Sequence, residues 1–215
     1  MELDVLLKEL NPALQLLFLM TALSIIPFVF VCMTSFLRFV VVFSILKTAL
    51  GTQQVPPGMV IIGLAMILTF YTMSPVFSEM YERGYEPYQK TGSIVLAMKE
   101  GSEPLKNFMM RQTRQADVAF FLETLNKKPP KTPEDISIWE VAPAYIMSEL
   151  KTSFEIGFII FIPFIVIDLV VANILLALGM MMLSPTIISL PFKLLVFIAV
   201  DGWGMVVHGL VKSFN

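Results

Sequence analysis

The stretch IGFIIFIPFIVIDLVVANILLAL, residues 156–178, decides the fold class of this chain. Its 23 residues contain one charged side chain, Asp168, and one proline, Pro163. An apolar run of about 18 residues or more with few charges predicts a membrane-spanning helix, because a helix needs roughly 20 apolar residues to cross a bilayer. We therefore expect an integral membrane protein.

The sequence outside this stretch repeats the pattern on both sides of a polar middle. No charge occurs between Glu9 and Arg38 or between Lys47 and Glu79, whereas residues 79–155 hold 22 of the 32 charged side chains. The whole chain is 56% hydrophobic and only 15% charged, against about 25% charged in soluble domains. We expect an all-α membrane protein in which two long, proline-interrupted hydrophobic helical hairpins flank a small, mainly helical polar middle.

The boundaries of these parts follow from the breaks in the apolar pattern. The acidic start is untypical of a signal peptide, so we expect an uncleaved N-terminus. The second apolar segment is expected to end near Phe77 and the third to begin near Ile156. The expected parts are an N-terminal segment (1–11), the first hairpin (12–78), the polar middle (79–150) and the second hairpin with a methionine-rich tip (151–215).

The first apolar segment has an unusual length. A helix from Pro12 to about Leu50, kinked at Pro27, would measure roughly 58 Å, almost twice the bilayer's hydrocarbon core of about 30 Å. Either this helix ends near Phe36 and Arg38 lies at the surface, or the protein does not sit in the bilayer in the ordinary way.

Several functional classes are disfavoured by composition. The net charge of −2 and the lack of a basic patch argue against nucleic-acid binding. Cys32 and His208 are the only residues of their kinds, which argues against a clustered Cys/His metal site. No phosphate-binding loop, zinc-protease or nucleophile-elbow motif occurs. We therefore expect no enzyme, no catalytic residue, no cofactor and no metal.

Three charges fall inside the apolar segments of the second hairpin: Asp168, Lys193 and Asp201. Counting back from a turn at residues 181–182, Asp168 and Lys193 lie roughly 20 Å and 17 Å along their helices, within one turn of each other. We expect a buried charge pair that fixes the register of the hairpin. The alternative is a proton relay, which usually needs a longer chain of such groups.

Met180, Met181 and Met182 occupy the expected tip of this hairpin. Methionine is unbranched, polarisable and adaptable. In a ring of identical subunits, three methionines would form a soft apolar constriction that excludes ions by dewetting and yields to a passing chain. The alternative is that they touch lipid or a neighbouring subunit.

Motifs along almost the whole chain resemble the FliP/SctR family of type III export-gate proteins. Residues 51–54 (Gly-Thr-Gln-Gln) are similar to the flagellar branch, whereas residues 173–177 resemble the injectisome branch, so both remain open. The motifs that carry the resemblance are residues 33–36, 49–57, 69–76, 146–152, 156–164, 167–172, 179–183, 188–194 and 201–203.

The resemblance implies a channel-forming subunit that passes unfolded flagellar subunits across the bacterial inner membrane, within the flagellar basal body. It implies a homo-oligomer of several copies, about five, assembled with FliQ-like and FliR-like membrane subunits and other export-apparatus components. The methionines of the tip match the family's gasket against ion leak. Within the polar middle we expect subunit contacts at Phe108, Phe121 and Glu149. A proton-coupled solute transporter that uses the three membrane charges remains the alternative from another class.

Overall fold

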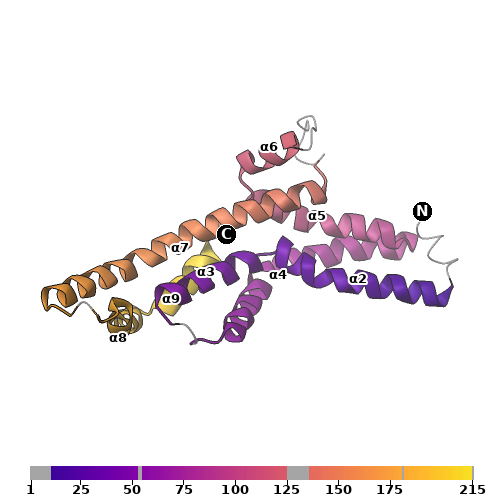
Figure 1. Cartoon of the computed structure of the whole chain (residues 1–215). Helices are drawn as coiled ribbons and strands as arrows, with labels where there is room; N and C mark the ends of the chain where they lie inside the picture. The colour runs from indigo at the N-terminus through magenta and orange to yellow at the C-terminus, as the bar shows by residue number, and fades with distance from the viewer. Residues whose placement is uncertain (1–10, 53–54, 125–135, 181, 215) are drawn as a thin grey trace. The chain divides into compact units, whose positions relative to one another are not determined.

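The computed structural model describes residues 11–52, 55–124, 136–180 and 182–214. Within these ranges the chain forms eight helices and no strand, which confirms the all-α class (Figure 1). The helices are α2 (Pro12–Met33), α3 (Phe36–Ala49), α4 (Gly58–Thr91), α5 (Ile94–Gln112), α6 (Gln115–Thr124), α7 (Ile138–Ala177), α8 (Pro185–Ala199) and α9 (Gly202–Lys212).

Two of these helices, α4 and α7, are long and apolar enough to cross a membrane. Two further candidates are broken pairs, α2 with α3 and α8 with α9, so the described chain has up to four spans if each bent pair is counted as one. Helices of 34 and 40 residues exceed the roughly 20 residues that a bilayer needs. The chain is a membrane protein whose long helices continue beyond their apolar parts.

Packing divides the chain into two units. The first combines Met1–Leu37 with Thr69–Glu149, and the second combines Arg38–Leu68 with Leu150–Asn215. The long helices α4 and α7 contribute residues to both units. Each unit therefore joins segments that are far apart in the sequence.

The break between α2 and α3 is held by contacts within the first unit. The expected continuous helix ends at Met33, and the Thr34 hydroxyl accepts a hydrogen bond from the Phe36 N–H at 3.3 Å. The Thr34 carbonyl accepts a hydrogen bond of 2.8 Å from the hydroxyl of Tyr145, whose side chain is fully buried and lies against Phe108. A helix end buried in this way needs such partners for its free backbone groups.

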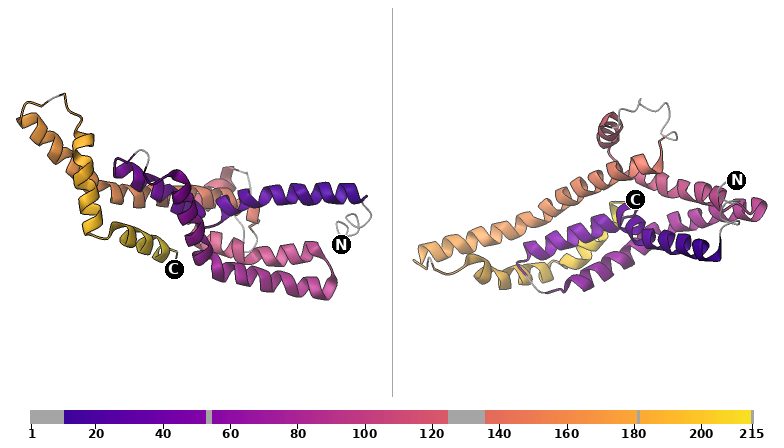
Figure 2. Two further views of the ribbon diagram at one scale, coloured as in Figure 1. Left: turned by 90° about the horizontal axis from the view of Figure 1, so that it is seen from below. Right: turned by 45° about the vertical axis from the view of Figure 1, so that its right-hand side comes forward.

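The helices α4 and α5 form an antiparallel hairpin in the first unit (Figure 2). Helix α4 does not stop near Phe77 but continues through the charged residues to Thr91. Ion pairs one helical turn apart, Arg83–Glu79 at 2.7 Å and Lys90–Glu86 at 3.2 Å, support the helix there. The chain then turns at Gly92, and Ser93 accepts a hydrogen bond from the N–H of Leu96 at the start of α5.

The second unit has an apolar core built from α3, α7 and α8. Gly157 of α7 lets Ile45 of α3 approach closely, because a Cβ at Gly157 would lie 2.9 Å from the Ile45 Cγ2. Tightly packed side chains of this kind set the relative position of the helices. The core consists of Leu46, Ala49, Leu50, Phe164 and Phe197.

Arg38 follows the end of α2 at Met33 and lies inside the second unit. Arg38 is only 2% exposed. Its guanidinium donates hydrogen bonds to the backbone carbonyl and hydroxyl of Ser213, at 3.1 and 2.9 Å, and lies 3.8 Å from the ring centroid of Phe214. A cation beside carbonyls at a helix C-terminus and over an aromatic ring is well satisfied, so the charge is accommodated inside the second unit.

Candidate functional site

The site lies on the hairpin of α7 and α8, which is closed by a glycine-dependent turn. Helix α7 ends at Ala177 and is followed by Gly179 at a φ of +73°. The Gly179 N–H donates to the Leu176 carbonyl at 3.0 Å, and the Met180 N–H donates to the Leu175 carbonyl at 2.9 Å. This pattern is the Schellman motif, which favours glycine at the left-handed position. Pro185 then starts α8, as proline commonly does at a first helical position.

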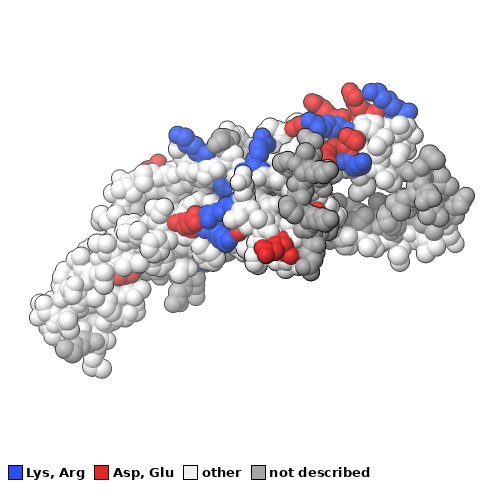
Figure 3. Space-filling view, turned by 90° about the horizontal axis from the view of Figure 1, so that it is seen from above, with Lys and Arg blue, Asp and Glu red and all other residues white. Residues whose placement is uncertain are grey.

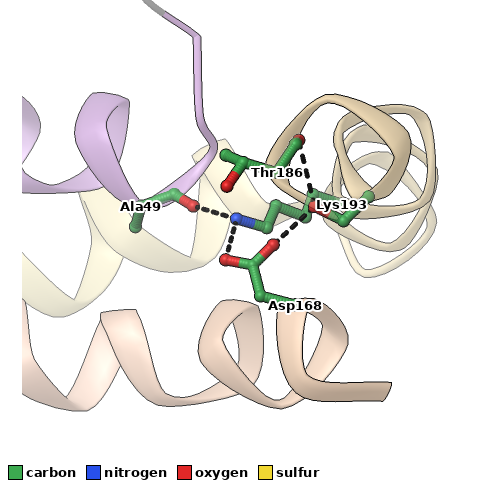
Figure 4. A network of polar contacts seen from close by, with 5 residues as sticks. Ala49, Asp168, Thr186 and Lys193 are labelled. Atoms are coloured by element: carbon green, nitrogen blue, oxygen red, sulfur yellow. Dashed lines mark hydrogen bonds and ion pairs between the residues drawn. The ribbon is translucent and has the colours of Figure 1, made fainter. Parts of the chain in front are cut away.

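Asp168 of α7 and Lys193 of α8 meet inside this hairpin (Figure 4). The Lys193 Nζ lies 2.7 Å from Asp168 Oδ2, and the Ser189 hydroxyl donates to Asp168 Oδ1 at 2.5 Å. The Ser189 oxygen also lies 3.1 Å from the Thr186 carbonyl. The Lys193 side chain is 3% exposed, whereas that of Asp168 is 31% exposed.

Lys193 also ties α8 to the end of α3. Its ammonium donates a hydrogen bond of 3.1 Å to the carbonyl of Ala49, the last residue of α3. Carbonyls in the last turn of a helix have no partner within the helix and favour a nearby cation. Gly51, two residues after Ala49, has a φ of +77°, and a Cβ there would lie 3.9 Å from Nζ.

This arrangement joins three helices through one buried cation. A buried ion pair adds little net stability, but removing one partner is strongly destabilising because it leaves the other charge unpaired. The geometry therefore suits a clamp that fixes the register of α7 against α8 and seats the end of α3. Its functional role stays a prediction.

Asp201 does not join this pair. It lies at the break between α8 and α9, two helices bent by 63°, and its backbone has a φ of +50°. Aspartate tolerates this left-handed conformation better than most residues. Asp201 is exposed and makes no ion pair within the described residues. A carboxylate at the start of α9 has a favourable interaction with the helix dipole.

Two methionines of the turn are exposed. Met180 is 44% exposed, and Met182 is fully exposed. Met181 lies outside the described residues. A fully exposed thioether at a hairpin tip has no packing partner among the described residues, so it is available to a neighbouring molecule.

The three expected contact residues of the polar middle lie in the first unit. Phe108 is 4% exposed and Glu149 is fully buried. Phe121 is half-buried, with its ring edge-on to Phe120 at 5.4 Å. Because Phe108 and Glu149 are inside the fold of one chain, any effect they have on subunit contacts acts through the surface that they support. Their role in assembly stays a prediction.

Two polar contributors to buried sites were not expected from the sequence. Ser189 stands four residues before Lys193 and so shares its helix face, a spacing that could have predicted its contact with Asp168. The buried Asp117 accepts a hydrogen bond of 2.6 Å from Ser148. No sequence signal indicated that contact, because the two residues lie 31 positions apart.

Comparison with known proteins places these features in a family. The family model described as "FliP family" matches residues 19–210. The flagellar biosynthetic protein FliP of Pectobacterium carotovorum is 46% identical over 203 residues, which cover 94% of this chain and 79% of that protein.

Two further relatives carry the same name. The protein of Bacillus subtilis strain 168 is 45% identical over 96% of this chain and 94% of its own length. That of Buchnera aphidicola (subspecies Baizongia pistaciae) is 48% identical over 94% of this chain and 56% of its own length. The matched region includes the charge pair and the methionine turn, and the chain belongs to the FliP family.

Proposed function

We propose that this chain is a channel-forming subunit of the bacterial flagellar type III protein export gate, and that its methionine turn limits ion leak. The relatives named flagellar biosynthetic proteins favour the flagellar branch over the injectisome. In this proposal Met180, Met181 and Met182 of several copies meet around a shared conduit. An unfolded flagellar subunit displaces these flexible side chains as it passes.

The observation that carries the proposal is that the second hairpin pairs its charges internally and exposes apolar methionine at its tip. Its membrane charges Asp168 and Lys193 bond to each other within the chain, whereas Met182 is fully exposed. A ring of apolar side chains excludes hydrated ions by dewetting. Methionine suits such a ring because its unbranched chain adapts to changing shapes.

The outer surface of the hairpin supports an assembly with other membrane subunits. Large apolar side chains of α7 face outwards, among them Phe158 at 66%, Ile159 at 67% and Leu169 at 58% exposure. Extended apolar surfaces of this kind mark lipid or protein contacts. We infer partners in further copies of this chain, about five, in FliQ-like and FliR-like subunits, in other export-apparatus and basal-body components, and in unfolded export substrates. The location is the bacterial inner membrane.

The test is the triple variant Met180→Ala, Met181→Ala, Met182→Ala in cells that carry the whole apparatus. We expect ion leak under a membrane potential to rise, because alanine leaves the constriction wider, while the subunit still assembles. The matched control is Met59→Ala, which removes another exposed methionine, 84% exposed, outside the turn. Wild-type leak and wild-type export in the triple variant would contradict the gasket.

A further inference from the structure

The hairpin of α4 and α5 has a defined inner face, which fixes where its outer flanks lie. A Cβ at Gly84 of α4 would lie 3.2 Å from the Ala97 carbonyl, and a Cβ at Gly101 of α5 would lie 3.2 Å from the Met80 carbonyl. The two glycines therefore mark the faces through which the helices touch. Successive helical residues are about 100° apart, so a residue two positions from either glycine points about 200° away, to the outside.

On α4, the residue two positions before the glycine is Glu82. It lines a groove of about 470 Å³ with Phe70, Phe77, Tyr81 and two serines. The neighbouring charges on α4 are already paired with each other, Arg83 with Glu79 and Lys90 with Glu86. Glu82 is exposed and makes no ion pair within the described part of the chain. This flank thus presents one free carboxylate beside aromatic rings.

On α5, the residue two positions before the glycine is Lys99. It is exposed and stands next to Met98, which is 71% exposed. The acidic residue one turn further on, Glu103, lies 3.6 Å from the ammonium of Lys106. In the residues that the structure describes, Lys99 has no ion-pair partner. This flank thus presents one free ammonium beside an apolar side chain.

We propose that these two flanks meet between copies of this chain, with Lys99 and Met98 of one copy seated in the groove beside Glu82 of the next. The free charges are equal and opposite, and aromatic rings beside a carboxylate favour a cation. On the face drawn in Figure 3, charged side chains of both signs lie close together beside extended uncharged areas. The inference rests on the proposed function, which requires several copies around one conduit.

The contact is head-to-tail. A self-complementary pairing of the α4 flanks would set Glu82 against Glu82, and like charges across an interface are repulsive. Because each copy carries one flank of each kind on opposite sides of a single hairpin, the same contact repeats from copy to copy. Heterologous contacts of this kind build rings or helical arrays.

Charge reversal tests the contact. Glu82→Lys alone and Lys99→Glu alone each place like charges together, and we expect each to lower the yield of the extracted multimer at least about tenfold. The combined variant restores opposite charges and is expected to recover the multimer. The matched control is Lys212→Glu, which reverses an exposed charge of α9 in the second unit and is expected to leave the yield unchanged. Two single variants that keep the wild-type yield would overturn the proposal.

Disulfide crosslinking gives an independent readout. In a Cys32→Ser background, which removes the only cysteine, Glu82→Cys with Lys99→Cys is expected to yield a ladder at multiples of 24.2 kDa on oxidation. Each single cysteine is expected to yield none. A dimer from Glu82→Cys alone, or a bond to a different protein, would overturn the head-to-tail contact.

The mass of the complex distinguishes failure of this contact from failure of the proposed function. A multimer in mild detergent that lacks both the ladder and the charge-swap recovery would overturn this contact and leave the proposed function standing. A wild-type chain that is monomeric there, with wild-type ion leak in the methionine variant, would overturn both.

Discussion

Removing the charge of Asp168 is expected to harm the protein more than removing that of Lys193. Asp168→Asn leaves the ammonium of Lys193, 3% exposed, with only neutral oxygens, one of them the Ala49 carbonyl. Lys193→Met leaves a carboxylate that is 31% exposed and keeps its hydrogen bond from Ser189. The two partners therefore differ in how well water and neighbours can satisfy the charge that remains.

The magnitudes follow from this difference. Removing one partner of a buried ion pair lowers the free energy of unfolding by about 3–5 kcal/mol. In Asp168→Asn, Lys193 keeps two neutral acceptors, the Ala49 carbonyl and the new amide oxygen, so we expect a loss near the lower end, about 3 kcal/mol. For Lys193→Met we expect about 1–2 kcal/mol, the usual loss for a hydrogen-bonded group that stays partly hydrated. The variant with both substitutions has no unpaired charge, and replacing a buried pair by neutral residues is often nearly neutral, so about 1 kcal/mol is expected.

The assay is the thermal unfolding of the purified chain in detergent. For a chain of this size each kcal/mol corresponds to about 2–4 °C in Tm, so Asp168→Asn is expected to lower Tm by about 6–12 °C and Lys193→Met by about 2–8 °C. The double variant is expected to unfold above Asp168→Asn. Equal losses in the two single variants, or a double variant whose loss equals their sum, would refute the clamp.

Four other variants probe the packing within each of the two units. Gly63→Ala, where a Cβ meets nothing within 4 Å, is expected to raise Tm through a helix-propensity gain of about 1 kcal/mol. Gly157→Ala is expected to lower Tm, because its Cβ meets Ile45. Shifts of Tm in the same direction for both variants would contradict this. Tyr145→Phe removes the donor to the buried Thr34 carbonyl and is expected to lower the free energy of unfolding by about 1–3 kcal/mol, measured by urea titration. An unchanged free energy of unfolding would show that this hydrogen bond does not stabilise the break. Arg38→Met removes the cation that holds the end of α9. Amide hydrogen exchange at residues 209–213 is expected to become faster; unchanged exchange would show that the Arg38–Ser213 hydrogen bonds are dispensable.

The sequence predicted the meeting of Asp168 and Lys193 because helix geometry alone determines it. Once the turn is placed near Met182, a rise of 1.5 Å per residue brings equal distances on two antiparallel helices side by side. Ala49 was not expected as a third member, since its contribution is a backbone carbonyl that becomes available only where α3 ends. A backbone group of this kind has no sequence signature.

Helix boundaries were harder to predict, because packing decides them. The break at Thr34 contains neither glycine nor proline, the usual sequence signals of a helix break. Its free carbonyl is instead satisfied by the distant Tyr145. Helix α7 begins at Ile138, well before the expected Ile156, because its first part is amphipathic and was counted with the polar middle. The contact of Arg38 with Ser213 had no sequence signal either, because the two residues lie 175 positions apart.

The bend at Asp201 limits how much of a membrane the two helices beside it can cross. Helix α8 has 15 residues and α9 has 11, which correspond to about 22 Å and 16 Å, so neither piece alone reaches across a lipid layer of about 30 Å. Joined as one rod, the two would be long enough. The pair therefore has the length of a full span only when both helices lie in line, and the 63° bend shortens the thickness of lipid that the two can cover.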